Sequence, residues 1–250
     1  MRNAIAAELM KLRRSRALPL LLIVCLAPPA VKLLRALLAP AAGGVSWQSF
    51  LASGQELTVF SLLIAVLLSA NHVFTQEYRF RTAAAVFTVQ TGRTAIFTAK
   101  IITLFLMIPA MFLLSALAQL LCGAAAVPGA LPRELLGTFL LVQLWYAAAF
   151  SLLAVAAGLV AVLVKRFTPA AVITLGYYIL LFPFHTKTLY VCFFMTPVVI
   201  AARLFGSADY IFAFDYRDIT AGLPQAAVFL LALGAASFAA GLCIYRRADA

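Results

Sequence analysis

Charged residues are scarce in this sequence, and their scarcity limits the class of protein. Only 11% of the 250 residues are charged, whereas 65% are hydrophobic. A soluble domain of this size could not hide so much apolar surface from water. A helix of about 20 residues crosses the hydrocarbon core of a bilayer. Four runs of that length or more contain no Asp, Glu, Lys or Arg, and they cover residues 57–76, 101–132, 135–164 and 219–245. The composition therefore predicts an all-α integral membrane protein.

The residues that catalysis or metal binding requires are also missing or dispersed. A GxxxxGK[ST] phosphate-binding loop is absent, so the chain does not bind ATP through a Walker motif. The four cysteines form no CxxC pair, and His72 and His185 lie at opposite ends of their apolar segments. No acidic residue lies deep in an apolar run. We therefore expect no catalytic residue, no metal and no cofactor in this chain.

The basic residues are distributed as topology signals. The formal net charge is +11, but Lys and Arg cluster where apolar runs end and do not form one patch for nucleic acid. Such clusters bind anionic headgroups and mark cytoplasmic loops. They predict a multi-pass protein of the cell (cytoplasmic or inner) membrane, with both termini in the cytoplasm. The six predicted spans cover residues 17–38, 57–75, 96–121, 135–164, 168–184 and 224–245, and residues 40–56 and 122–133 form external loops.

One apolar segment does not fit a full crossing. Residues 188–204 are short and contain Pro197. We interpret them as a re-entrant or interfacial helix within an external region, residues 185–223. A seventh span would instead place Arg246 and Arg247 outside, against the usual cytoplasmic excess of basic residues.

Residues 1–16 differ from the spans because they carry five basic residues and one acidic residue. Ile5, Leu9 and Leu12 recur at helical spacing and predict an amphipathic helix that lies at the cytoplasmic membrane interface. A simple basic flank of the first span is the alternative. Near the outer end of that span, the long side chain of Lys32 is expected to extend towards the headgroups.

Few polar residues lie inside the predicted spans. Gln119, Gln143 and Thr174 either form hydrogen bonds between helices or line a substrate path, and both alternatives stay open. Small residues at four-residue spacing, in pairs that end at Gly158 and Gly241, predict close approach between helix backbones.

The segment between the second and third spans, residues 73–100, has the most distinctive pattern. Glu77 follows an apolar span directly, and aromatic and basic residues come next. A helix-capable run, residues 82–87, ends at a break near Gly92, and Arg93 opens the third span. A short amphipathic helix joined to two spans could transmit a push from a soluble partner into the bundle. From the residues alone, an ordinary cationic loop is the alternative.

The same segment resembles the first cytoplasmic loop of ABC-2 type permeases, in which a Glu, a Thr, a turn and a Lys follow in this order. The corresponding residues here are Glu77, Thr82, Gly92-Arg93 and Lys100. The N-terminal E-x-x-K-x-x-R-S pattern, residues 8–15, and the closing Tyr-Arg-Arg-Ala-Asp, residues 245–249, also look like that family. Among its members, the small permeases of bacitracin-type and lantibiotic-immunity exporters look closest.

The resemblance implies a single transmembrane permease domain over residues 1–250, with the type V exporter-like topology of ABC-2 proteins. Residues 76–95 would form a coupling segment that docks into a separate ABC ATPase dimer, which binds ATP and Mg. A second permease, identical or related, would complete the pathway. The residues that would contact the ATPase are Glu77, Tyr78, Arg79, Phe80, Arg81, Thr82, Phe87 and Arg93.

These features together predict the transmembrane subunit of an ATP-driven exporter, which is not itself an enzyme. Its substrate would be amphipathic, such as an antimicrobial peptide, a lipid or a hydrophobic drug, and the expected role includes antimicrobial peptide resistance. The expected partners are the ATPase, a second permease and membrane lipids, and not nucleic acid. An ion-coupled carrier or a membrane-embedded enzyme is the main alternative, and a non-transporting scaffold is another.

Overall fold

The computed structural model describes residues 2–15, 17–38, 45–80, 92–181 and 223–247. Within these residues every regular element is an α-helix, and no strand is present. The helices are α1 (Arg2–Arg13), α2 (Ala17–Leu38), α3 (Trp47–Ala52), α4 (Gln55–Arg79), α6 (Arg93–Ala126), α7 (Arg133–Val164), α8 (Phe167–Leu181) and α10 (Leu223–Arg247).

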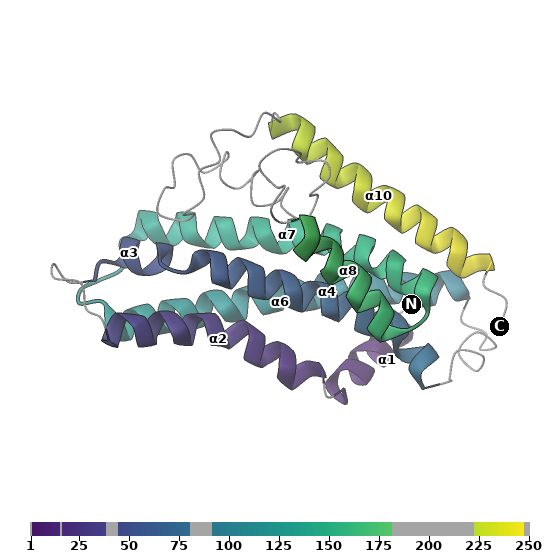
Figure 1. The fold of residues 1–250 in the computed structure, drawn as a ribbon, viewed down its shortest axis with the longest axis horizontal. Helices are drawn as coiled ribbons and strands as arrows, with labels where there is room; N and C mark the ends of the chain where they lie inside the picture. Colours follow the sequence, from purple (N-terminus) through teal and green to yellow (C-terminus); the bar gives the residue numbers. More distant parts are fainter. Residues whose placement is uncertain (1, 16, 39–44, 81–91, 182–222, 248–250) are drawn as a thin grey trace.

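Four long helices, α2, α4, α6 and α7, form the body of the molecule (Figure 1). Helix α7 is central, because it packs against α4, α6, α8 and α10, while α2 packs against α4 and α6. The rings of Phe112, Tyr146 and Phe150 contact one another inside this bundle, and all three side chains are fully buried. Lipid supplies no hydrophobic force between helices, so close packing of this kind holds the bundle together.

The predicted all-α membrane architecture is confirmed. Among the residues that the structure describes, five helical segments are long and apolar enough to cross a membrane: α2, α3 with α4, α6, α7 and α10. Helix α8 is a shorter apolar helix in the described residues. The bounds of α2 coincide with the predicted first span, and α4 and α6 extend past their predicted ends by about one to one and a half turns.

Helix α3 corrects the prediction that residues 40–56 form only an external loop. The Ser46 side chain accepts a hydrogen bond from the backbone N–H of Ser49, and Ser49 in turn caps Ser46, which is a complete capping box. Trp47 is buried, and its Nε1 donates to the carbonyl oxygen of Gly129, 3.1 Å away. Six residues are too few to give a periodic signal, so the capping pair and the tryptophan were the only indications in the sequence.

Four helix ends meet at one end of the bundle: α1, the end of α4, the start of α6 and the end of α10 (Figure 1). Arg93 donates from Nη1 to the carbonyl oxygen of Arg246, 3.3 Å away. The ring of Phe97 lies 5.5 Å, centroid to centroid, from those of Phe74 and Tyr245. These contacts tie α4, α6 and α10 to one another, so none of the three can move alone at this end.

The close approach predicted at the small residues is present, but aromatic rings fill the space in place of helix backbones. A Cβ atom added at Gly158 would lie 2.5 Å from Cε2 of Phe74, and one at Gly241 would lie 2.8 Å from Cζ of Phe97. Both distances are far inside van der Waals contact. The two glycines therefore admit the rings that bridge α4, α6, α7 and α10.

The predicted re-entrant helix, residues 188–204, lies outside the described residues, as does the region around it up to residue 222. The division of the chain into a coupling segment at residues 76–95 and an external region at residues 185–223 stays a prediction.

Candidate functional site

Two carboxylates and two ammonium groups form a buried cluster where α1, α4 and α6 meet. Nζ of Lys100 lies 2.7 Å from Oε1 of Glu77 and 3.2 Å from Oε2 of Glu8. Nζ of Lys11 lies 2.5 Å from Oε1 of Glu8 and 3.0 Å from Oε1 of Glu77. The side chains of Lys100, Glu77 and Glu8 are only 0%, 2% and 5% exposed. We call these four residues the charge cluster.

The charge cluster is neutral as a set, because its two negative and two positive charges balance. Each ammonium group faces both carboxylates, and Lys100 also donates to the carbonyl oxygen of Val73, 2.8 Å away. Removing an ion from water costs several kcal/mol unless good partners replace the water. The ion pairs therefore make the burial of Glu8, Glu77 and Lys100 possible, while Lys11 stays 37% exposed.

The placement of the charge cluster follows from helical spacing. Glu8 and Lys11 are three residues apart on α1 and so share one face of that helix. Glu77 lies in the last turn of α4, and Lys100 lies about two turns after the start of α6. The cluster thus fixes the position of α1 against the ends of two membrane-capable helices.

The buried face of α1 differs from the apolar face that the sequence predicted. Leu12 is buried, but Leu9 is 40% exposed and the acidic Glu8 takes a buried position. Glu8 can be buried because two ammonium groups contact it, which the sequence pattern alone does not reveal. The helix itself is as predicted, and its location at a membrane interface stays a prediction.

The pKa of Lys11, on α1 and outside the membrane-capable helices, reflects the surroundings of its ammonium group. Burial lowers the pKa of Lys11, but the hydrogen bond to Glu8 and the charges of Glu77 and Glu8 together outweigh that effect. The pKa of Lys11 is therefore raised above its ordinary value of 10.5. Its ammonium group stays charged throughout the physiological range, and its ion pairs persist there.

The predicted coupling residues divide into buried and exposed groups. Glu77 faces the charge cluster, and the ring of the half-buried Tyr78 lies 5.9 Å from Nζ of Lys165, in the turn between α7 and α8. Phe80, in contrast, is 66% exposed just after the end of α4. Arg93 is half-buried at the start of α6. Three further predicted residues, Arg81, Thr82 and Phe87, lie outside the described residues, and Arg79 is described only as the last residue of α4.

The three residues predicted for a substrate path are all buried, and within the described part of the chain no hydrogen bond joins them to one another. Thr174 of α8 accepts a hydrogen bond from Nδ2 of Asn71 of α4 at 2.8 Å. Gln119 of α6 accepts one from Lys32 of α2 at 2.7 Å. Gln143 lies on the buried side of α7. Two of the three thus link helices, and a part in a substrate path stays a prediction for all of them.

The position of Lys32 corrects the expectation that it extends towards the headgroups. Its side chain is 3% exposed, and Nζ donates to Oε1 of Gln119, to the carbonyl oxygen of Leu51 and to Oε1 of Gln55 at 2.7, 3.0 and 3.2 Å. Three oxygens replace the water around the ammonium group, which is why burial is possible. Lys32 thereby joins α2, α3, α4 and α6 at the end of the bundle opposite to the charge cluster (Figure 1).

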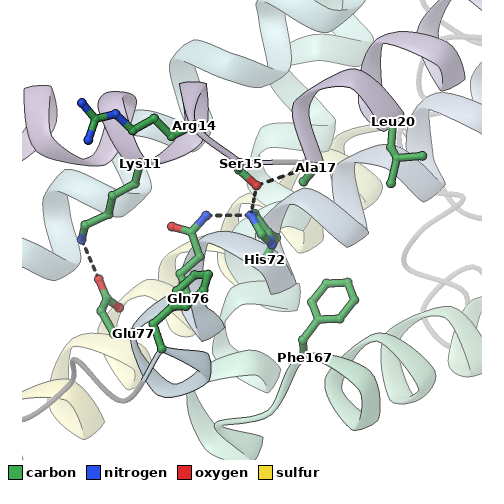
Figure 2. Close-up of a pocket in the computed structure, with 10 residues that line it drawn as sticks. Lys11, Arg14, Ser15, Ala17, Leu20, His72, Gln76, Glu77 and Phe167 are labelled. Carbon is green, nitrogen blue, oxygen red and sulfur yellow. Dashed lines mark hydrogen bonds and ion pairs between the residues drawn. The ribbon is translucent and has the colours of Figure 1, made fainter.

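A pocket of about 760 Å³ adjoins the charge cluster. Lys11 and Glu77 belong to both, and Figure 2 shows them at one side of the pocket, with Leu20 and Phe167 at the other. Between them, Nε2 of His72 lies 2.7 Å from both Oγ of Ser15 and Nε2 of Gln76. The residues that line the pocket are Lys11, Arg14, Ser15, Ala17, Leu20, His72, Gln76, Glu77, Phe80 and Phe167.

A bundle of membrane-capable helices, held by a charge cluster at one end, defines a multi-pass membrane protein. The family model described as an ABC-2 family transporter protein matches residues 4–181, which is well over half of the chain. The chain therefore belongs to the ABC-2 family of transporter proteins, and it is a permease subunit of an ABC transporter. The comparison with curated proteins found no match.

The sequence did not single out Lys32 as a site residue, and Glu8, Lys11 and Lys100 were noted only as parts of motifs. Glu8 is the only acid in a basic segment, and Lys100 is set two turns into an otherwise apolar helix. Both positions need a partner of opposite charge, which was the available signal. The sequence does not show which residues meet, because 92 positions separate Glu8 from Lys100.

Proposed function

We propose that this chain is the membrane-spanning subunit of an ATP-driven exporter. ATP and Mg bind to a separate ABC ATPase dimer, and closure of that dimer moves the coupling segment, residues 76–95. The charge cluster is the observation that carries the proposal, because it lies at the base of this segment and links it to α1 and α6.

Force at the coupling segment reaches the bundle along two routes. Glu77 contacts both ammonium groups of the charge cluster, so its displacement acts on α1 and α6 together. Tyr78 lies against Lys165, so movement of the α4 end also acts on the turn between α7 and α8. A two-state change of the bundle can follow when ATP binding favours one arrangement of these helix ends.

The proposed ATPase contact is formed by exposed residues of the coupling segment. Phe80 offers an exposed aromatic side chain of the kind that dominates protein interfaces. Arg79, Arg81, Thr82 and Phe87 complete the proposed contact, together with Tyr78 and Arg93 at its margins. Glu77 is buried and does not contact the ATPase in this proposal; its ion pairs hold the coupling segment in position.

In this proposal both chain ends and the coupling segment lie in the cytoplasm, and the bundle crosses the cell membrane. The meeting of α1, the end of α4 and the end of α10 at one end of the bundle supports a common side for all of them (Figure 1). A second permease, identical or related, completes the pathway at an apolar face of this chain.

The proposed substrate is amphipathic, since the interior is mainly apolar with a few amide and hydroxyl groups such as Gln119, Gln143 and Thr174. The resemblance to bacitracin-type and lantibiotic-immunity exporters favours an antimicrobial peptide within this class, with lipid or hydrophobic drug as the further candidates. The biological role would then be resistance to such peptides.

The test is Phe80→Ala in the affinity-tagged chain, purified from its native membrane, with the co-purifying ABC ATPase quantified by mass spectrometry. Loss of an aromatic anchor at an interface should weaken retention of the ATPase about tenfold, corresponding to about 1.4 kcal/mol. Leu106→Ala is the matched control, because Leu106 is an exposed apolar residue in the middle of α6. Equal ATPase retention in the two variants would refute the proposed contact.

A further inference from the structure

The pocket beside the charge cluster has one basic end. Arg14 lines it and is exposed, and its guanidinium makes no ion pair or hydrogen bond within the part of the chain that the structure describes. The carboxylate of Glu77 does not neutralise Arg14, because it already faces Lys11 and Lys100. The charge cluster is neutral as a set, so Arg14 leaves this end of the pocket with a net positive charge.

The opposite end of the pocket is apolar. Ala17 and Leu20, from the first turn of α2, line it together with Phe167 at the start of α8. Leu20 is 63% exposed, so the apolar wall continues onto the outer surface of a membrane-capable helix. Figure 2 shows Leu20 and Phe167 on the side of the pocket away from Arg14 and Lys11.

The middle of the pocket supplies hydrogen-bonding groups between these ends. Ser15 and His72 lie there, in hydrogen-bond contact with each other at 2.7 Å. The lining of the pocket therefore changes from basic to polar to apolar along its length. A membrane changes in the same order, from its charged surface to its hydrocarbon core.

We propose that this pocket is a binding site for an anionic phospholipid, with its phosphate at Arg14 and one acyl chain along Leu20 and Phe167. Charge complementarity selects the phosphate, and the continuous apolar wall selects a molecule that carries a chain. The volume of about 760 Å³ accommodates a headgroup with the first part of a chain and far exceeds the need of a free phosphate ion. This inference concerns lipid binding by the chain itself and does not rest on the proposed exporter function.

A lipid bound in this pocket would extend from α1 to α2, and it would contact the charge cluster through Lys11. Occupancy would then stabilise the attachment of α1 to α4, because the same headgroup contacts Arg14 of the α1–α2 junction while Lys11 holds Glu77. The site thereby couples lipid composition to the geometry of the end of the bundle that carries the coupling segment.

The experiment measures lipid binding to the full-length chain in detergent by native mass spectrometry, with dioleoyl phosphatidylglycerol and dioleoyl phosphatidylcholine as probes. Arg14→Gln should weaken phosphatidylglycerol binding about fivefold and phosphatidylcholine binding less, because the choline cation of the latter already offsets the attraction of its phosphate to Arg14. Arg13→Gln is the matched control, because Arg13, the last residue of α1, is the exposed neighbour of Arg14 and does not line the pocket. Equal weakening in both variants would overturn the proposal in favour of a diffuse surface charge.

A second pair of variants tests the apolar end. Ala17→Phe should fill the space beside Leu20 and weaken binding of both lipids, whereas Ala27→Phe, on an exposed position of α2 outside the pocket, should not. Inorganic phosphate serves as the competing probe. Displacement of phosphatidylglycerol by micromolar phosphate, or equal binding of the two lipids by the unmodified chain, would overturn the assignment to an anionic phospholipid.

Discussion

Burial of the Lys100 ammonium group depends on two carboxylates, and this dependence can be measured. Removing one partner of a buried ion pair leaves the other without compensation, which costs about 3–5 kcal/mol. Glu77→Gln should therefore lower the thermal midpoint of the purified protein strongly, and the double variant Glu77→Gln with Lys100→Met should recover part of the loss. Glu134→Gln, at an exposed carboxylate on α7, is the control. Equal midpoints for Glu77→Gln and Glu134→Gln would contradict the role of the charge cluster.

Gly158 offers a second test at the scale of single residues. Its missing side chain admits the ring of Phe74, so Gly158→Ala forces the ring or helix α7 to shift. Overpacking of this kind typically costs about 1–3 kcal/mol. Gly137→Ala on the same helix meets no atom within 4 Å and should be neutral or stabilising. Thermal unfolding of the two variants gives the comparison, and similar midpoints would show that the contact with Phe74 adapts without cost.

Among the elements, α1 depends most on electrostatics, because its buried face carries Glu8 and Lys11. The pKa of Lys11 is raised in the folded protein, so its charge stabilises the attachment of α1 at every pH below the ordinary value of 10.5. The stabilisation is lost as the pH rises through the raised pKa. A spin label at the exposed Ala6, in a variant with the other cysteines replaced, should therefore stay immobile to pH 10 and become mobile at higher pH.

Lys11→Arg is the control for this alkaline release. A guanidinium group stays charged at pH values where an ammonium group does not, so the label should remain immobile in this variant. The other ionisable groups of the cluster, Glu8, Glu77 and Lys100, are unchanged. If Lys11→Arg released α1 at the same pH as the unmodified chain, the titration of Lys11 would not be the cause.

The long helices were predictable from the sequence because membrane spans have a strong compositional signal. The first predicted span coincides with α2, and the remaining long helices differ from their predictions only near their ends. Helix α3 was not predicted, since six residues with a capping box produce no run of apolar residues. Lys32 was assigned to the headgroup region because nothing in its neighbourhood along the chain reveals Gln119, which is 87 positions away.

At the scale of the whole molecule, the meeting of helix ends predicts which positions share a side of the membrane. Cysteines placed at Phe80 and Arg247 should both resist a membrane-impermeant maleimide in intact cells and react after permeabilisation. A cysteine at Gly129, at the opposite end of the bundle beside Trp47, should react in intact cells. Labelling of the Phe80 position from outside would reverse the orientation and remove the basis of the coupling mechanism.

The family could be inferred from the sequence, whereas the functional core of the site could not. Short motifs around Glu77 and in residues 8–15 resemble ABC-2 permeases, and the family match agrees with that inference. The structure shows that the two motifs contact each other: Glu8 and Lys11 of one form ion pairs with Glu77 and Lys100 of the other. The sequence did not reveal this contact. Pairings between distant segments depend on helix packing, and one sequence carries no direct record of them.

The charge cluster has a consequence for the order in which the chain is made. Glu8 and Lys11 leave the ribosome early, yet their partners follow 66 and 92 positions later. During that interval the first helix has only one ion pair of its own, between neighbours on the same turn. Its full set of ion pairs can therefore form only after α6, the third long helix, has been made. Lys100, in turn, is made only after both of its carboxylate partners, Glu8 and Glu77, are already part of the chain.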